Sequence, residues 1–177
     1  MSSHPFDKLS LNDGGTLIFT PCPGTKGTGL RASLAQLAQA GAKGVITLMP
    51  DDEMVHNEVT ELPQACSEIG LQWFHFPIED NASPGEAFQR AWEKNKERVF
   101  GILNQKGASA IHCKGGSGRT GLMAAIILLE RGMPYEQAVA QVKSLRPNAL
   151  QLTAHTDYLA QNYDDGIESG LSNRGNQ

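Results

Sequence analysis

The sequence predicts an α/β protein with a central, mostly parallel sheet of four to five strands flanked by helices. Short apolar runs alternate with longer segments of helical composition through most of the chain. This alternation is typical of parallel sheets, whose connecting helices cover both faces. The chain has 177 residues, of which 40% are hydrophobic and 19% charged. Such a length and composition are ordinary for one globular domain with a sizeable core, so we expect a single domain over 1–177.

Four segments have the length and the β-branched or aromatic content of buried strands. They are residues 16–20, 45–48, 73–78 and 108–112. The polar, turn-rich residues 1–15 are expected to form an N-terminal arm across the surface, and residues 165–177 a flexible tail.

Helical segments lie between and after these runs, and cap residues or glycines mark their ends. They are 34–41 after a Ser33 cap, 62–69, a long helix after Ser83 and Pro84 that ends near Gly107, 119–131, 135–145, and 153–163 after a Thr153 cap. The long helix is expected to turn Ala87, Ala91, Val99, Ile102 and Leu103 inward. Asp51 and Asp52 have the character of acids at a helix start.

Charge and cysteine content limit the classes of partner and compartment. The net charge is −4, and no basic tract is present, so we expect no nucleic-acid partner. No apolar run has membrane-spanning length, and no signal-peptide pattern opens the chain. The three cysteines fit a reducing compartment, so a cytoplasmic protein is expected. The sequence does not fix the oligomeric state, for which a monomer is the expectation.

Residues 108–131 hold the strongest functional signal in the chain. An apolar strand is followed by a glycine-rich loop, 113–118, and then by a segment of helical composition. A strand that turns through glycines into a helix start directs backbone N–H groups and the positive end of the helix dipole at one point. The sequence therefore predicts an anion site in this loop.

The residues at the two ends of this loop indicate phosphoryl chemistry. A cysteine at a helix start is favoured as the thiolate, so Cys113 could attack phosphorus. Arg119 has the planar fork that binds two phosphoryl oxygens. Gly115, Gly116 and Gly118 are expected to adopt positive φ and let the backbone approach the anion. Thr120 could donate to the sulfur and help it leave.

The run from His112 to Thr120, HCKGGSGRT, resembles the signature loop of the cysteine-dependent protein tyrosine phosphatases. In that pattern, His-Cys is followed by five residues, an arginine and Ser or Thr. Over about residues 15 to 163 the chain is most similar to the kinase-associated phosphatase branch of the compact dual-specificity group. The resemblance implies a phosphatase that acts on phosphotyrosine, and also on phosphoserine and phosphothreonine, through a phosphocysteine intermediate.

The resemblance also implies roles for residues outside the loop. Asp80, in a stretch PIED that resembles the family's acid loop, would be the general acid, with Glu79 as the other candidate. Gln151 would orient the water that hydrolyses the intermediate, although it also fits as a plain helix-start residue. His112 would hold the loop by donating to its carbonyls. Lys114, Gly115, Gly116, Ser117, Gly118 and Arg119 would bind the phosphate.

Three other functions stay open at this point. Lys114 also occurs in phosphoinositide-directed members of the family, so a phosphoinositide or other small-molecule phosphatase is the first alternative. A non-catalytic phosphoresidue-binding module is the second, and a sulfur-transfer enzyme of the rhodanese kind is a remote third. No His or Cys spacing resembles a zinc site, and no metal or other cofactor is expected. Cys22 is a loop cysteine that could pair with Cys113 as a redox brake, whereas Cys66 is expected in the core.

Overall fold

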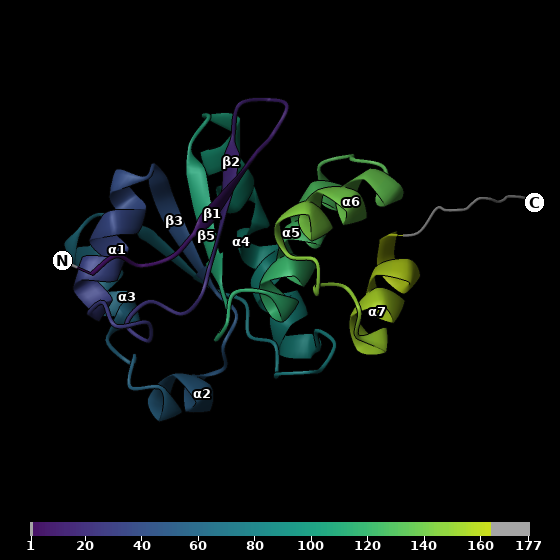
Figure 1. Ribbon diagram of the computed structural model, residues 1–177. Coiled ribbons are helices and arrows are strands. Elements are labelled where there is room, and N and C mark those ends of the chain that lie inside the picture. Colours follow the sequence, from purple (N-terminus) through teal and green to yellow (C-terminus); the bar gives the residue numbers. More distant parts are fainter. Residues whose placement is uncertain (1, 164–177) are drawn as a thin grey trace, which may run out of the picture.

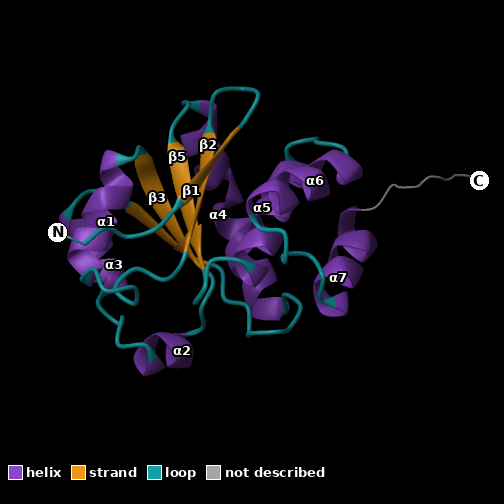
Figure 2. Ribbon diagram, in the orientation of Figure 1, coloured by secondary structure: helices purple, strands orange, loops and turns teal. Residues whose placement is uncertain are grey.

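The computed structural model describes residues 2–163, so the expected tail at 165–177 lies outside the described residues. These residues form a five-stranded sheet in the order β1-β2-β5-β3-β4 (Figure 2). Strand β1 pairs with β2 antiparallel, and every other pair is parallel. The α/β class and the mostly parallel sheet predicted from the sequence are thus confirmed.

The strands are β1 (Asp7–Ser10), β2 (Thr16–Thr20), β3 (Ala42–Thr47), β4 (Gln72–His75) and β5 (Ala108–His112). The helices are α1 (Leu30–Gln39), α2 (Asp51–His56), α3 (Leu62–Glu68), α4 (Glu86–Asn104), α5 (Gly118–Glu130), α6 (Tyr135–Leu145) and α7 (Thr153–Tyr163). In the part of the chain that the structure describes, no helix is both long and apolar enough to cross a membrane.

Each face of the sheet has its own hydrophobic core. Helices α1 and α3 pack on one face, while α4 and α5, with α6 and α7 outside them, pack on the other (Figure 1). Helix α5 is buried continuously from Arg119 to Leu128. A helix that is apolar on all sides belongs in a protein interior, which is why α5 lies between the sheet and the outer helices.

The carboxyl ends of the four parallel strands meet at one edge of the sheet. Thr20 and Thr47 are both in register with His112, and Thr47 is also in register with His75. The loop that starts at Cys113 leaves from this edge, between the ends of β2 and β3, and α2 lies below it in Figure 1. Sites in parallel sheets form at this edge because the connecting loops converge there.

Several element boundaries differ from those expected. Strand β1 lies within the residues predicted to form an arm. It was not predicted as a strand because its sequence, DKLS, is polar and mostly exposed at the edge of the sheet. Strand β4 ends at His75, although the Phe76 N–H still donates to the Thr47 carbonyl at 3.0 Å. Pro77 cannot donate to a ladder, so the regular pairing stops before it.

Two helix starts were also placed wrongly. Helix α1 begins at Leu30, and Ser33 is buried inside it, where its hydroxyl donates to the Thr28 carbonyl at 3.2 Å. Helix α4 begins at Glu86 rather than at Pro84, with Gly85 as its N-cap. Its buried face contains Phe88 and Trp92, and Ala91 is partly buried against the same core, whereas Ala87 is exposed. Aromatic side chains remove more apolar area from water than alanines, which decides the orientation of the helix.

Candidate active site

The loop between β5 and α5 surrounds the sulfur of Cys113. The Gly116 N–H donates to this sulfur at 3.3 Å, and the Thr120 hydroxyl donates to it at 3.2 Å. Cys113 is 4% exposed. Two donors that converge on one sulfur at a helix N-terminus stabilise negative charge there.

The backbone turn of the loop is concentrated at Gly116, whose φ is 83°. A Cβ at this position would lie 2.6 Å from the Pro21 nitrogen, so the loop packs against the end of β2 in a way that only glycine allows. The positive φ expected at Gly115 and Gly118 was wrong. One left-handed residue completes the turn, and Gly118 already has the helical conformation of α5.

His112 holds the start of the loop through a chain of hydrogen bonds. Its Nδ1 lies 3.0 Å from the Cys113 carbonyl oxygen, and its Nε2 lies 2.7 Å from the Thr47 hydroxyl. A carbonyl only accepts, so Nδ1 carries the proton and Nε2 accepts from Thr47. The Thr47 oxygen in turn accepts from the Trp73 indole N–H at 2.8 Å. This assignment is that of the neutral imidazole, the form that burial favours.

Burial lowers the pKa of His112 to about 4, against an ordinary value of 6.5. In the unfolded chain the His112 imidazole therefore becomes protonated below about pH 6.5, whereas in the folded protein it stays neutral down to about pH 4. We expect the free energy of unfolding to fall as the pH drops through this window, with roughly 3 kcal/mol from this histidine. Urea unfolding at a series of pH values measures the effect.

His112→Asn is the variant that tests this assignment. It should be less stable at neutral pH yet lose less stability between pH 6.5 and 4. Burial also lowers the pKa values of His4 and His155, so a smaller acid dependence should persist in the variant. An acid dependence as steep as that of the wild type would show that His112 is not its source.

Arg119 is buried beside the loop and is held by Glu53, a residue that the sequence analysis did not single out. The guanidinium donates from Nη1 and Nη2 to the two carboxylate oxygens of Glu53, each at 2.8 Å. Nη1 also donates to the Ile78 carbonyl at 2.9 Å. Arg119 is 3% exposed. The end of the guanidinium is therefore fixed by α2 and by the segment after β4.

The other edge of the Arg119 guanidinium is available for an anion. Glu53 occupies the end between Nη1 and Nη2, and within residues 2–163 no hydrogen bond from Nε is found. Nε and the second N–H of Nη2 form the side-on fork that binds two oxygens of a phosphate. Glu53 therefore orients the arginine without blocking this edge.

Asp80 lies at the mouth of the same site. Its Oδ1 is 3.6 Å from Arg119 Nη2, and its side chain is 69% exposed. It follows Ile78, whose carbonyl accepts from the same guanidinium, in a loop tethered to α7 by a hydrogen bond between His155 and the Ala82 carbonyl at 3.0 Å. The structure thus brings Asp80, Arg119 and Cys113 to one edge of the sheet.

Comparison with known proteins agrees with this geometry. A family model described as "Polymorphic toxin system, DSP-PTPase phosphatase" matches residues 23–133, more than half of the chain. The chain belongs to this DSP-PTPase family. It is a cysteine-based phosphatase of the protein tyrosine and dual-specificity type.

Relatives of this DSP-PTPase include cyclin-dependent kinase inhibitor 3 of Rattus norvegicus, which is 27% identical over 86% of the chain and 73% of the relative. Protein tyrosine phosphatase domain-containing protein 1 of Bos taurus is 29% identical over 67% of the chain. The matched region makes up 16% of that longer protein. The crystal structure of kinase associated phosphatase with its catalytic cysteine changed to serine has a TM-score of 0.79 and 23% identity, and covers 91% of this chain and 94% of that one. The expected likeness to the kinase-associated branch is thus confirmed.

Not every predicted site residue of the DSP-PTPase has a described contact with the loop. Gln151 is exposed, and its side chain donates to the Pro147 carbonyl at 3.5 Å. Its role with the hydrolytic water stays a prediction. Lys114 is exposed on the loop, and Ser117 is the N-cap residue of α5.

The two other cysteines are buried and free, and Cys66 lies in the core as expected. Burial raises the pKa of Cys22 to about 12 and that of Cys66 to about 12. Both are therefore thiols at neutral pH, which are weak nucleophiles.

Proposed function

We propose that this phosphatase hydrolyses phosphotyrosine in protein substrates, and phosphoserine and phosphothreonine as well, through a phosphocysteine on Cys113. The observation that carries the proposal is the pairing of a sulfur that accepts two hydrogen bonds with an arginine whose Nε has no hydrogen-bond partner among residues 2–163. Nucleophile and phosphate clamp are thereby positioned before substrate arrives, which is the main source of catalysis in phosphoryl transfer.

In the first step the Cys113 thiolate attacks phosphorus, and the bond to the ester oxygen breaks. The remaining backbone amides of the loop, other than the Gly116 N–H that donates to the sulfur, and the side-on edge of Arg119 bind the equatorial oxygens. Asp80, protonated, gives its proton to the departing oxygen so that a neutral alcohol or phenol leaves. Its exposed position beside Arg119 gives it access to that oxygen.

In the second step water attacks the phosphocysteine, and the sulfur leaves as a thiolate. Asp80, now ionised, accepts the proton of the water. The Thr120 hydroxyl, which donates to the sulfur at 3.2 Å, stabilises the thiolate as it leaves. Inorganic phosphate is the product, and the cysteine and aspartate return to their starting states.

Charge around the site supports protein substrates over inositol polyphosphates. The exposed Lys114 is a basic group on the loop and is the feature that favours a phosphoinositide. Against it stand carboxylates on the two segments that hold Arg119, which are Asp51, Asp52 and Glu53 on α2 and Glu79 and Asp80 after β4. Several phosphates on one small ring would be repelled by this rim.

A substrate panel with Asp80→Asn tests the proposal. The wild type should hydrolyse matched phosphotyrosine and phosphothreonine peptides faster than inositol phosphates at equal concentration. Asp80→Asn should lower kcat about 10²-fold and remove the basic limb of its pH profile, because the proton donor is lost.

Glu79→Gln is the matched control, since it removes the same charge from the neighbouring exposed position. It should retain the bell-shaped profile and most of the activity. If instead the Glu79 variant loses the basic limb and the Asp80 variant keeps it, the acid is Glu79. A preference for inositol phosphates would replace the protein substrate by the small-molecule alternative.

We also propose a cytoplasmic location for the enzyme. A thiolate nucleophile is oxidisable and needs a reducing compartment. The free state of Cys22, Cys66 and Cys113 is consistent with this.

A further inference from the structure

We infer that Arg146, which follows α6, is a positioning residue that fixes the phosphate loop from outside. Its Nε donates to the Gly116 carbonyl at 2.7 Å. Nη1 donates to Asp7 at 2.8 Å and Nη2 to the Phe19 carbonyl at 3.3 Å. The guanidinium carbon lies 5.6 Å from the centre of the Phe19 ring. Strands β1 and β2 therefore hold Arg146, and Arg146 holds the loop.

This contact determines where the loop directs its amides. In a trans peptide unit the C=O and the following N–H point in opposite directions. Because the Gly116 carbonyl is turned toward Arg146, the Ser117 N–H is turned away from it, toward the inside of the loop. The same logic applies to the Lys114 carbonyl, which accepts from the Cys22 N–H at 3.0 Å. Each outward carbonyl leaves one amide free for the phosphate.

The position requires an arginine because its side chain must donate to three different acceptors at once. One planar group serves a loop carbonyl, a strand carbonyl and a carboxylate, which the point charge of a lysine cannot do together. The side chain is 14% exposed. Its positive charge beside the loop also favours bound phosphate. Arg146 lies beyond residues 23–133, the part of the chain that the family model matches.

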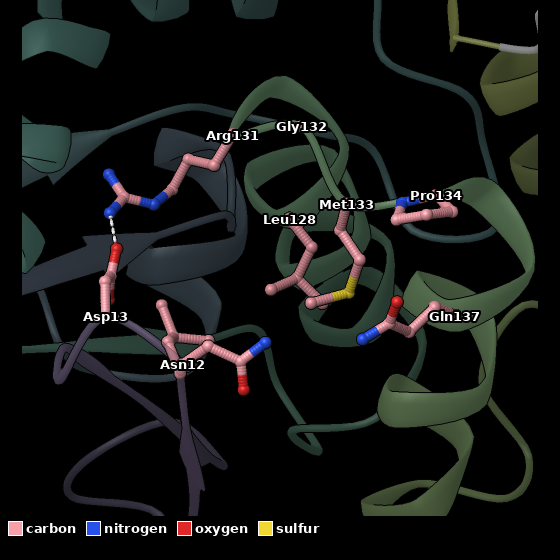
Figure 3. A pocket seen from close by; sticks show the side chains of 9 residues that line it. Asn12, Asp13, Leu128, Arg131, Gly132, Met133, Pro134 and Gln137 are labelled. Atoms are coloured by element: carbon pink, nitrogen blue, oxygen red, sulfur yellow. Dashed lines mark hydrogen bonds and ion pairs between the residues drawn. The ribbon is translucent and has the colours of Figure 1, made fainter.

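Arg131 offers a closely matched control at the other end of α5. It pairs with Asp13, as Arg146 pairs with Asp7, and its side chain is 16% exposed. Its guanidinium carbon also lies 5.6 Å from a phenylalanine ring, that of Phe100. Figure 3 shows Arg131 directed at Asp13. Both residues line a cavity of about 280 Å³. The length of α5, about 20 Å, separates this cavity from the phosphate loop.

The experiment compares Arg146→Met with Arg131→Met. Arg146→Met should weaken inhibition by vanadate about 10-fold, and lower kcat/KM for a phosphotyrosine peptide by about 10-fold to 100-fold. Alkylation of Cys113 by iodoacetate at mildly acidic pH should also slow, because Gly116, whose N–H donates to the sulfur, is no longer held in place through its carbonyl. Arg131→Met should leave all three unchanged. Thermal unfolding of both variants separates loss of fold from loss of positioning.

Two further variants keep the test decisive if Arg146→Met does not fold. Arg146→Lys, which retains one donor and the charge, should recover part of the vanadate affinity. Asp7→Asn should lower the vanadate affinity less than Arg146→Met or Arg146→Lys does. Equal effects of the Arg146 and Arg131 variants would overturn the inference. It rests on the proposed phosphate site, and that site itself fails only if wild-type protein is not inhibited by vanadate.

Discussion

Cys113→Ser is expected to lower kcat by roughly 10⁴-fold or more while binding of phosphopeptides is retained. A serine hydroxyl is not ionised at neutral pH, so nothing at the base of the loop attacks phosphorus. The amides of the loop and the Arg119 fork remain in place and still bind the phosphate. Turnover of a phosphotyrosine peptide and binding of the same peptide by isothermal titration measure the two parts of this result.

Cys66→Ser is the control for introducing a hydroxyl at a buried cysteine. Cys66 is 0% exposed in α3, on the opposite face of the sheet from α5. Its serine variant should lose stability but keep its activity per folded molecule. Near wild-type turnover by Cys113→Ser that EDTA does not remove would show that the phosphocysteine mechanism is wrong.

Arg119→Lys is expected to lower kcat/KM by about 10³-fold although the positive charge is kept. A lysine cannot bind the Glu53 carboxylate with one edge and two phosphoryl oxygens with another. Glu53→Gln should cost less, about 10-fold, because the amide still accepts one hydrogen bond but no longer fixes both ends of the guanidinium. Steady-state kinetics with one phosphotyrosine peptide gives both values.

The matched control for this pair is Arg31→Lys. Arg31 binds Glu68 through Nε and Nη2 at 2.8 and 3.2 Å, but this fork is exposed to solvent and lies away from the loop. Exposed ion pairs contribute little, so neither activity nor stability should change much. If Glu53→Gln were as harmless as Arg31→Lys, Glu53 would have no part in orienting Arg119.

The sequence predicts most of this fold because its strongest patterns are local. Strand Ala108–His112 and helix Tyr135–Leu145 have the bounds that composition and flanking Gly or Pro residues indicate. Strand β1 escaped prediction because it is short, polar and paired at an edge. The start of α1 was missed because no side chain caps it.

For the site, too, features that are local in the sequence could be predicted, whereas contacts between distant residues could not. The loop signature identifies Cys113 and Arg119, whereas Glu53 pairs with an arginine far away in the sequence. That contact depends on β3 lying beside β5, and strand order is not visible in the chain. The position of Glu53, soon after a strand that ends at the carboxyl edge, is the signal that could have found it.

The burial of α5 on all sides divides the tasks of catalysis between two parts of the protein. Arg119 lies in α5, and Cys113 begins the loop between the buried strand β5 and α5, so the core immobilises both. Asp80 instead belongs to an exposed connection. If Asp80 is the general acid, as we propose, adjustment to different alcohols or phenols falls to that connection, and we expect selectivity among phosphoesters to arise when the ester bond breaks rather than when the phosphate binds.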